Sequence, residues 1–389
     1  MRVAVFAHLP FHRPILAPIH DALGDRAERL LTSDRRQTVA FDPDVIVMAG
    51  HAELEYFRHH LPRALAVNVR HGMIGKRVIK RLPDRASART FDFVCVGDDE
   101  PLAAYEEAGA RPLEYWRTGY PQLDPLFRRD PAPALPLDPS RRTVLYAPTW
   151  NLGLTSAAML GARLVELIRA GAPGANVIIK PHPVIGDWRP RWMAQWARLA
   201  ERERGVLLVQ DTHADVTRYM LAADLLISDA SSAIFEFLAL DRPVVLVTNP
   251  RHRHDPAYEP GSIVWGWRDL GEEVHDAARL PAAVAEALRA PDARAERRRH
   301  YGRLLFGPFT DGRNHLRVVE KILALDTAAP RPAPAPAPPR LPARVWYDLR
   351  TRLSVSAPWR RLLLGPLEGL RLQARSWAWR QRSRWRGAR

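Results

Sequence analysis

The chain has 389 residues, 47% of them hydrophobic, and a formal net charge of +15. That length exceeds what one hydrophobic core usually holds, so we expect two domains. Thirteen arginines and two acidic residues lie between positions 340 and 389, so 11 of the 15 net positive charges belong to this C-terminal tail. The body therefore has the charge of an ordinary enzyme, which argues against a nucleic-acid partner.

The single cysteine, Cys95, lies in an apolar run, which predicts a buried, inert thiol. One cysteine cannot form an internal disulfide, which favours a reducing cytoplasm. The chain starts directly in a strand pattern, without the charged start and apolar run of a secretory signal. No apolar run approaches the roughly 18 residues that a spanning helix needs. We therefore expect a cytoplasmic protein that does not cross a membrane.

Short apolar runs rich in β-branched residues alternate with helical stretches along the body. They are residues 3–7, 45–49, 64–69 and 93–97 in the first third, and 144–147, 177–179, 206–209, 225–227 and 244–247 after it. This alternation predicts α/β domains with parallel strands covered on both faces. A proline-rich segment separates the two sets, and it cannot continue a helix or a central strand.

The predicted organisation has five parts. They are an N-terminal Rossmann-like domain (1–130), a linker (131–141), a second Rossmann-like domain (142–325), a proline- and alanine-rich spacer (326–342) and the basic tail (343–389). Folds of this kind bind ligands outside the carboxyl ends of their strands. Polar residues that follow a predicted strand are therefore the candidates for a site.

Two histidines follow predicted strands. The loop after residues 64–69 contains Arg70, His71, Gly72 and Lys76. A histidine there can act as a base near neutral pH, although a lone loop histidine is commonly a surface residue. The strand at 177–179 ends in Lys180 and His182, and prolines on both sides of His182 fix the backbone and aim the imidazole.

The strand at 225–227 stops at a polar turn, and a helix begins with two serines. This turn and helix contain Asp229, Ser231, Ser232 and Glu236. A helix start exposes backbone N–H groups and carries partial positive charge, so a phosphate group fits there. The alternative is an ordinary helix cap by Asp229 or Ser231. Thr149 follows the strand at 144–147 and joins the candidates.

Several familiar catalytic motifs are absent from the sequence. It has no HExxH, no paired cysteines, no DxD-like acidic pair in a loop at the end of a strand and no GxxxxGK[ST] loop. These absences argue against zinc sites and P-loop chemistry, so we expect neither a metal nor a cofactor. Charge on a departing phosphate would be stabilised by histidine, lysine and the helix start.

Six short motifs occur in one order along the body. They are His71-Gly72 with Lys76, Gly119-Tyr120-Pro121 with Asp124, the run from Tyr146 to Trp150, His182-Pro183, Asp229 with Ser231, Ser232 and Phe235, and Asp311-Gly312 with Asn314. In order and spacing, residues 65–325 resemble the CDP-glycerol glycerophosphotransferases of teichoic-acid and capsule synthesis.

This resemblance implies a GT-B fold, in which two Rossmann-like domains face a central cleft. It also implies that an alditol phosphate, with glycerol phosphate as the expected group, is transferred from a CDP-activated donor. The acceptor would be a hydroxyl of a membrane-linked glycan or polyol phosphate, and CMP would be released. His71 would be the base, and His182 would face the donor pyrophosphate. The implied donor-binding residues are Thr149, Lys180, Asp229, Ser231, Ser232 and Glu236, and those on the acceptor side are Arg70, Gly72, Lys76, Tyr120 and Asp124.

The tail has the pattern of a basic amphipathic helix. Apolar residues recur at three- and four-residue steps, and five of the 12 tryptophans lie here. Tryptophan together with arginine suits an anionic bilayer surface. The residues predicted to contact the membrane are Trp359, Arg360, Arg361, Arg371, Arg375, Trp377 and Trp379. We expect a peripheral protein on the inner face of the bacterial cell membrane; packing of this helix on the body is the alternative.

Two other functions stay open on the sequence alone. A GT-B sugar transferase or a nucleotide-sugar epimerase would share the fold, and an epimerase would need carboxylates in the cleft, for which Asp98, Asp99 and Glu100 are the candidates. A membrane-surface adaptor without activity is the third possibility, although both histidines and the serine pair argue against it.

Overall fold

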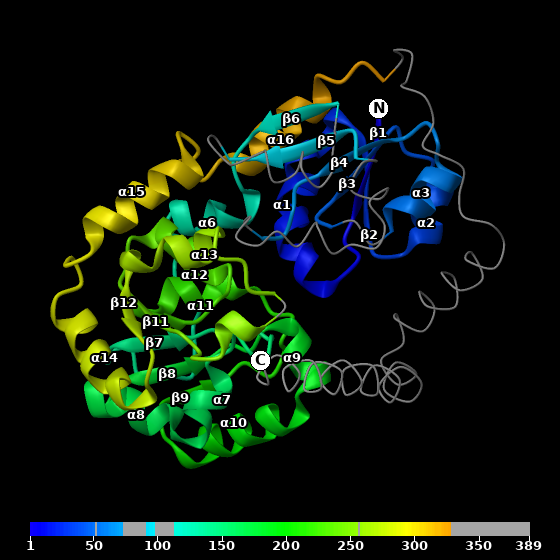
Figure 1. Cartoon of the computed structure of the whole chain (residues 1–389). Coiled ribbons are helices and arrows are strands. Elements are labelled where there is room, and N and C mark those ends of the chain that lie inside the picture. Colours follow the sequence, from blue (N-terminus) through cyan, green and yellow to red (C-terminus); the bar gives the residue numbers. More distant parts are fainter. Residues whose placement is uncertain (51–52, 73–90, 98–112, 256, 328–389) are drawn as a thin grey trace, which may run out of the picture. The chain divides into compact units, whose positions relative to one another are not determined.

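A computed structural model of the chain describes residues 1–50, 53–72, 91–97, 113–255 and 257–327 (Figure 1). The chain divides into two compact units, Met1–Ala335 and Pro336–Arg389, and all the described residues lie in the first. The described residues of this unit form two six-stranded sheets. Every strand pairing in both sheets is parallel. The predicted α/β class with two Rossmann-like halves is confirmed.

The first sheet has the strand order β2-β1-β3-β4-β5-β6. Its strands are β1 (Arg2–Phe6), β2 (Glu28–Thr32), β3 (Val45–Met48), β4 (Leu65–Asn68), β5 (Phe93–Val96) and β6 (Glu114–Arg117). The helices α2 (Arg35–Phe41) and α3 (Leu54–His60) lie on one face, and α1 (Arg13–Leu23) lies on the other. The order reverses between β1 and β3, so the connections from these neighbours leave in opposite directions and open a crevice at their carboxyl ends.

The second sheet has the order β12-β11-β10-β7-β8-β9. Its strands are β7 (Thr143–Tyr146), β8 (Asn176–Ile179), β9 (Val206–Leu208), β10 (Leu225–Ser228), β11 (Val244–Val247) and β12 (Glu272–Val274). Counted from β7, this is the order 3-2-1-4-5-6 of dinucleotide-binding sheets, and it reverses between β7 and β10.

Helices cover both faces of the second sheet. One face packs against α7 (Ala157–Leu160), α8 (Leu164–Gly171), α10 (Pro190–Arg202) and α14 (Leu280–Arg289). The other packs against α11 (Val216–Ala222), α12 (Ala233–Phe237), α13 (Ile263–Gly266) and α15 (Ala295–Phe306). Two further short helices, α6 (Asp124–Phe127) and α9 (Pro183–Trp188), follow β6 and β8.

The last described helix, α16 (Asn314–Leu323), returns to the first sheet. Its Val318, Val319 and Ile322 are fully buried in the core that α1 shares with that sheet, and Figure 1 shows it beside β5 and β6. The predicted second domain, 142–325, therefore differs from the structure at its end. The apolar stripe of α16 is buried only against residues far away in the sequence, so local patterning did not indicate its partner.

Every apolar run predicted as a strand forms one, but three observed strands were not predicted. These are β2, β6 and β12, and each lies at the edge of its sheet. Each begins with glutamate and is less buried than the central strands. These three edge strands, which have one side open to solvent, lack the continuous apolar run that marks a central parallel strand, whereas the fourth edge strand, β9, keeps such a run and was predicted.

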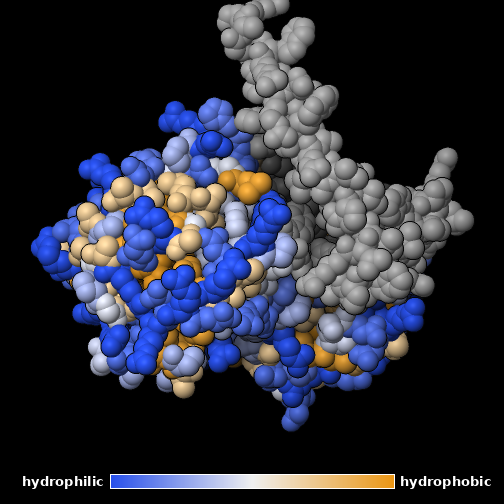
Figure 2. Space-filling view, turned by 90° about the horizontal axis from the view of Figure 1, so that it is seen from below, coloured by the Kyte–Doolittle hydropathy of each residue, from blue (hydrophilic) through white to orange (hydrophobic). Residues whose placement is uncertain are grey.

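The surface of the described part is mixed in character. Hydrophilic residues are interspersed with hydrophobic ones on the face in Figure 2. The large apolar side chains that are exposed, Met1, Leu113, Leu152 and Leu304, come from separate elements. Among the described helices, none combines the length and the apolar character needed to span a bilayer. Cys95 is buried, and burial raises the pKa of its thiol to about 12, which confirms the predicted inert cysteine.

Candidate active site

The polar residues predicted in the second half follow three neighbouring strands. β10, β7 and β8 lie side by side, and Asp229, Thr149 and His182 come after their respective carboxyl ends. The strand order reverses between β7 and β10, which is where such sheets bind ligands. The topology thus brings these three residues to one edge of the sheet.

Asp229 is a buried hub at this edge. Its carboxylate accepts hydrogen bonds from the backbone N–H groups of Thr149 at 2.8 Å, Ser156 at 2.7 Å and Ala230 at 2.7 Å. The Ser156 hydroxyl donates another at 2.7 Å. Burial raises the pKa of the Asp229 carboxyl, and these donors offset part of the rise. Because backbone and hydroxyl donors of the protein occupy its oxygens, Asp229 positions the loops after β7 and β10; a direct contact with the donor stays a prediction.

Arg268 supports the same turn from the buried side. Its guanidinium donates to the Asp229 carbonyl, to the Thr248 hydroxyl and, at 2.9 Å, to the Glu273 carboxylate. Desolvation lowers the pKa of Arg268, and the Glu273 carboxylate opposes this change. The turn that carries the serine pair is therefore held on both sides.

Ser231 and Ser232 stand immediately before α12, which is only five residues long. The Ser231 hydroxyl accepts the N–H of Ala233 at 3.3 Å, as in an ordinary cap, and the Ser232 side chain bonds to Glu236. Both serines are partly exposed. So short a helix has a small dipole, so phosphate binding here would depend on hydroxyl and N–H donors. Glu236 is buried, which raises its pKa to about 7, and it holds Ser232 in place.

His182 caps α9 through its ring. Its Nδ1 accepts the backbone N–H of Val184 at 3.2 Å. A nitrogen that accepts a hydrogen bond carries no proton, so the proton of the neutral ring is on Nε2. His182 therefore presents a hydrogen-bond donor at Nε2, which suits a phosphate oxygen. Its ring lies near Trp150, with 6.4 Å between the ring centroids.

Lys180 is buried beneath this loop. Its Nζ donates to the carbonyl oxygens of Pro181 at 3.1 Å and Thr212 at 2.8 Å. Desolvation lowers the pKa of Lys180 to about 8, while Asp211 and Asp215 favour the charged form. The ammonium group thus ties the loop after β8 to the loop after β9. These bonds position the two loops, and the contact of Lys180 with the donor stays a prediction.

His71 follows β4 in the first half, and its ring makes the opposite kind of hydrogen bond to that of His182. Its Nδ1 contacts the backbone carbonyl of Ala49. A carbonyl can only accept, so Nδ1 carries the proton and Nε2 keeps a lone pair. Desolvation lowers the pKa of His71 below 6.5, the Ala49 contact opposes this, and the Arg70 cation lowers it further. His71 is exposed to solvent and has the tautomer that a general base requires.

The loop that carries His71 lies against the serine turn of the second half. A Cβ placed on Gly72 would be 3.8 Å from the Ser232 hydroxyl oxygen. Arg70, with a φ of +63°, is buried next to it and donates to the Gly72 carbonyl at 3.2 Å. Two motifs that are about 160 residues apart in the sequence therefore meet. The candidate base and the candidate phosphate-binding turn therefore lie on the two sides of this contact.

Tyr120 and Asp124, predicted on the acceptor side, lie where α16 returns to the first half. The Asp124 carboxylate accepts the backbone N–H groups of Asn314 at 3.0 Å and His315 at 2.9 Å, and it contacts the His315 ring at 2.7 Å. Gly119 has a φ of +73°, and a Cβ there would be 2.6 Å from Asn314 Oδ1. The Gly-Tyr-Pro motif and the motif around Asn314 thus bind each other.

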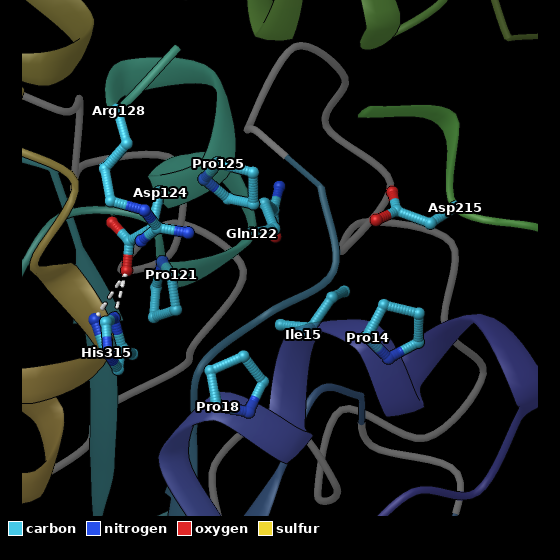
Figure 3. Close-up of a pocket in the computed structure, with 10 residues that line it drawn as sticks. All are labelled: Pro14, Ile15, Pro18, Pro121, Gln122, Asp124, Pro125, Arg128, Asp215 and His315. Carbon is cyan, nitrogen blue, oxygen red and sulfur yellow. Dashed lines mark hydrogen bonds and ion pairs between the residues drawn. The ribbon is translucent and has the colours of Figure 1, made fainter. Parts of the chain in front are cut away.

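A pocket of about 220 Å³ lies beside this junction (Figure 3). It is lined by Pro14, Ile15, Pro18, Pro121, Gln122, Asp124, Pro125, Arg128, Asp215 and His315. Ligand pockets usually measure ~300 Å³ or more, so it is small for a nucleotide donor. The structure accordingly gives Asp124 a role in joining segments.

Some predicted residues lie outside the described part of the chain. They are Lys76, the carboxylates Asp98, Asp99 and Glu100, and the tail residues Trp359, Arg360, Arg361, Arg371, Arg375, Trp377 and Trp379. In the part that the structure describes, no group of three or more histidine, cysteine, aspartate or glutamate side chains could hold a metal ion.

Residues 31–324 match the family model of the CDP-glycerol:poly(glycerophosphate) glycerophosphotransferases. The chain belongs to this family. The resemblance found in the six motifs is therefore confirmed, and the match extends beyond the motifs into residues 31–64, where no motif was recognised.

Two curated relatives of this glycerophosphotransferase-family protein act in teichoic-acid synthesis. The teichoic acid ribitol-phosphate polymerase TarK of Staphylococcus aureus is 23% identical over 203 residues, 46% of this chain and 38% of TarK. The teichoic acid glycerol-phosphate primase of Bacillus subtilis is 24% identical over 168 residues, 41% of this chain and 40% of the primase. The chain thus matches about two fifths of the length of each relative.

Solved structures confirm the GT-B type of fold. The wall teichoic acid polymerase TagF superposes with a TM-score of 0.66 at 15% identity, covering 84% of this chain and 89% of TagF. The UDP-GlcNAc 2-epimerase of Neisseria meningitidis gives a TM-score of 0.53 at 11% identity, covering 84% of this chain and all of the epimerase chain. The second likeness is more distant and concerns the fold alone.

Some residues at the candidate site of this glycerophosphotransferase-family chain are not marked by any sequence motif. Ser156 and Arg268 hold the Asp229 turn, and no motif marks either one. His12 lies in the loop after β1, with its ring 5.0 Å from the ring of His71. The first 60 residues contain no recognised motif, so only the sheet order could have placed His12 near the site.

Proposed function

We propose that the protein transfers an alditol phosphate from a CDP-activated donor to a hydroxyl of a polyol-phosphate or glycan acceptor and releases CMP. Glycerol phosphate is the expected transferred group. Family membership supports the donor class, since the family is described by its use of CDP-glycerol. The contact between His71 Nδ1 and the Ala49 carbonyl carries the mechanism, because it leaves Nε2 able to accept a proton.

In this reaction the acceptor hydroxyl gives its proton to Nε2 of His71. Its oxygen attacks the β-phosphorus of the donor and forms a new O–P bond. The bond from this phosphorus to the bridging oxygen breaks, and CMP leaves with the electron pair. His182, through its Nε2 proton, and the hydroxyls of Ser231 and Ser232 bind the pyrophosphate oxygens and stabilise the developing charge. The approach of Gly72 to Ser232 supports a reaction between the two halves.

The test is release of CMP by the purified full chain. CDP-glycerol, CDP-ribitol and UDP-N-acetylglucosamine are compared, each with and without a soluble glycerol-phosphate oligomer, and product length is measured by mass spectrometry. We expect CMP release that requires the oligomer and lengthens it, and His71→Ala serves as the inactive control. Turnover of the UDP-sugar alone would overturn the proposal in favour of a sugar transferase or an epimerase.

We assign the basic tail to the membrane on which the acceptor is carried. The tail has 13 arginines and five tryptophans, whereas the exposed large apolar side chains of the described body are scattered. Arginine near an anionic surface contributes about 1 kcal/mol per residue. Such a tail would hold the enzyme at the inner face of the membrane.

Removal of residues 340–389 tests this role. We expect the shortened chain to lose co-sedimentation with anionic vesicles and to keep its rate with the soluble oligomer. Neutral vesicles, which should bind neither form strongly, are the control. Equal co-sedimentation of both forms with anionic vesicles would refute the role of the tail.

A further inference from the structure

The loops after β1 and β3 meet at the point where the order of the first sheet reverses. His12 comes from the first of these loops, at the start of α1, and Gly50 comes from the second. The adjacent strand β4 leads to His71. Ligands of open α/β sheets bind at such a reversal. The topology therefore places His12 on the ligand-binding edge of the first half, next to the proposed base.

The His12 ring is buried without a polar partner. Its exposed fraction is 3%, and neither ring nitrogen has a hydrogen-bond partner among the residues that the structure describes. An unsatisfied buried polar group costs about 1–3 kcal/mol, and buried polar atoms are normally paired. A position that served only the stability of the fold would be better filled by an apolar side chain. This arrangement instead fits a ring that awaits a ligand.

Aromatic rings surround this histidine. Phe11 meets His12 edge to face at 4.6 Å between centroids, lies 5.5 Å from His71, and stacks on His213 of the second half at 5.7 Å. A Cβ on Gly50 would be 3.2 Å from His12 Cε1 and 3.5 Å from His71 Nδ1. Because glycine occupies position 50, the two imidazoles can approach each other, so His12 and His71 form one cluster.

The His12 ring is neutral at physiological pH. Burial, together with smaller contributions from the neighbouring His71, His8 and His213, lowers its pKa to about 3. A neutral imidazole has one N–H donor and one acceptor nitrogen. This pair matches a hydroxyl group, which both donates and accepts, whereas the oxygens of an ionised phosphate only accept and would leave the acceptor nitrogen of His12 unpaired.

We propose that His12 binds a hydroxyl group at the polyol end of the acceptor, beside the hydroxyl whose proton passes to His71. This inference rests on the proposed transfer reaction and adds a residue that recognises the acceptor. The aromatic cluster of Phe11, His71 and His213 encloses the same end of the polyol. His12 takes no proton in the reaction; it orients the attacking oxygen.

The experiment compares His12→Leu, which removes both polar nitrogens, with His12→Asn, which keeps a donor and an acceptor. His20→Asn on α1 is the control, since the His20 ring contacts Asp21 instead of this cluster. We measure KM for a glycerol-phosphate oligomer, the dissociation constant for CMP and the melting temperature. For His12→Leu we expect acceptor KM to rise about tenfold or more. CMP affinity should stay within twofold of wild type, and the melting temperature should be unchanged or higher.

His12→Asn should recover most of the acceptor affinity, and His20→Asn should behave as wild type. A lower melting temperature for His12→Leu with unchanged acceptor KM would show a structural role and overturn the inference. Equal weakening of CMP and acceptor binding would also overturn it, because His12 would then serve the donor. If the wild-type chain transfers nothing to the oligomer, the proposed function fails and this inference fails with it.

Discussion

His71 and His182 occupy similar places in the two halves, each in a loop that follows a central strand, yet their rings are oriented oppositely. The Nδ1 atom of His71 faces a backbone carbonyl, whereas the Nδ1 atom of His182 faces a backbone N–H group. One ring therefore presents a lone pair at Nε2 and the other a proton. The backbone group at Nδ1, more than the residue type, distinguishes the proposed base from the proposed phosphate-binding histidine.

Replacing each histidine by asparagine should give the largest difference in kcat between the two positions. His71→Asn removes the proton acceptor, so kcat should fall by about 10²–10⁴. His182→Asn keeps an N–H donor and a good helix cap, so kcat should fall far less, whereas His182→Ala loses both and should cost about 10²–10³. The measurement is CMP release under saturating donor and acceptor, with circular dichroism as the control for folding. Equal losses in the two asparagine variants would refute the assigned tautomers.

The pH dependence of kcat/KM sharpens the same comparison. His71 must be neutral to accept a proton, so activity should fall as the pH drops through its pKa, which desolvation holds below 6.5. Arg70 contributes to this lowering. In Arg70→Gln the pKa should rise, and the acid limb should move to higher pH, while Arg70→Lys should leave it nearly in place. An acid limb that is the same in all three proteins would show that His71 is not the group that titrates.

The smallest expected effect is that of replacing Glu236, which changes the stability of the fold. Its pKa is raised to about 7 from 4.5 in the folded state. Below pH 4.5 both states hold the proton and stability is unaffected; as the pH rises towards 7, only the unfolded state ionises readily, so stability falls. Glu236→Gln should therefore gain about 1–3 kcal/mol at pH 8 and nothing near pH 4.

Urea unfolding at the two pH values measures this gain. Glu201→Gln is the matched control, because Glu201 is exposed on α10. A gain for Glu236→Gln that is equal at pH 4 and pH 8 would show that the raised pKa is not its cause.

The central strands, the loops that carry His71 and His182, and the serine turn could be predicted from local patterns. A parallel strand covered on both faces needs a continuous apolar run, and that need appears directly in the sequence. The edge strands β2, β6 and β12 lack such a run, so they could not be found in the same way. The roles of Lys180, Asp124 and Asp229 could not be predicted either, since each bonds to backbone groups that come near only in the folded chain.

By itself, the sequence determined the fold class, the two Rossmann-like halves and the family, because apolar periodicity and short motifs are local properties of the chain. Only the tertiary structure decided which nitrogen of each histidine carries the proton, where α16 packs, and that His12 lies unpaired beside His71. These features depend on groups that are distant in the sequence and become neighbours when parallel strands align their carboxyl ends.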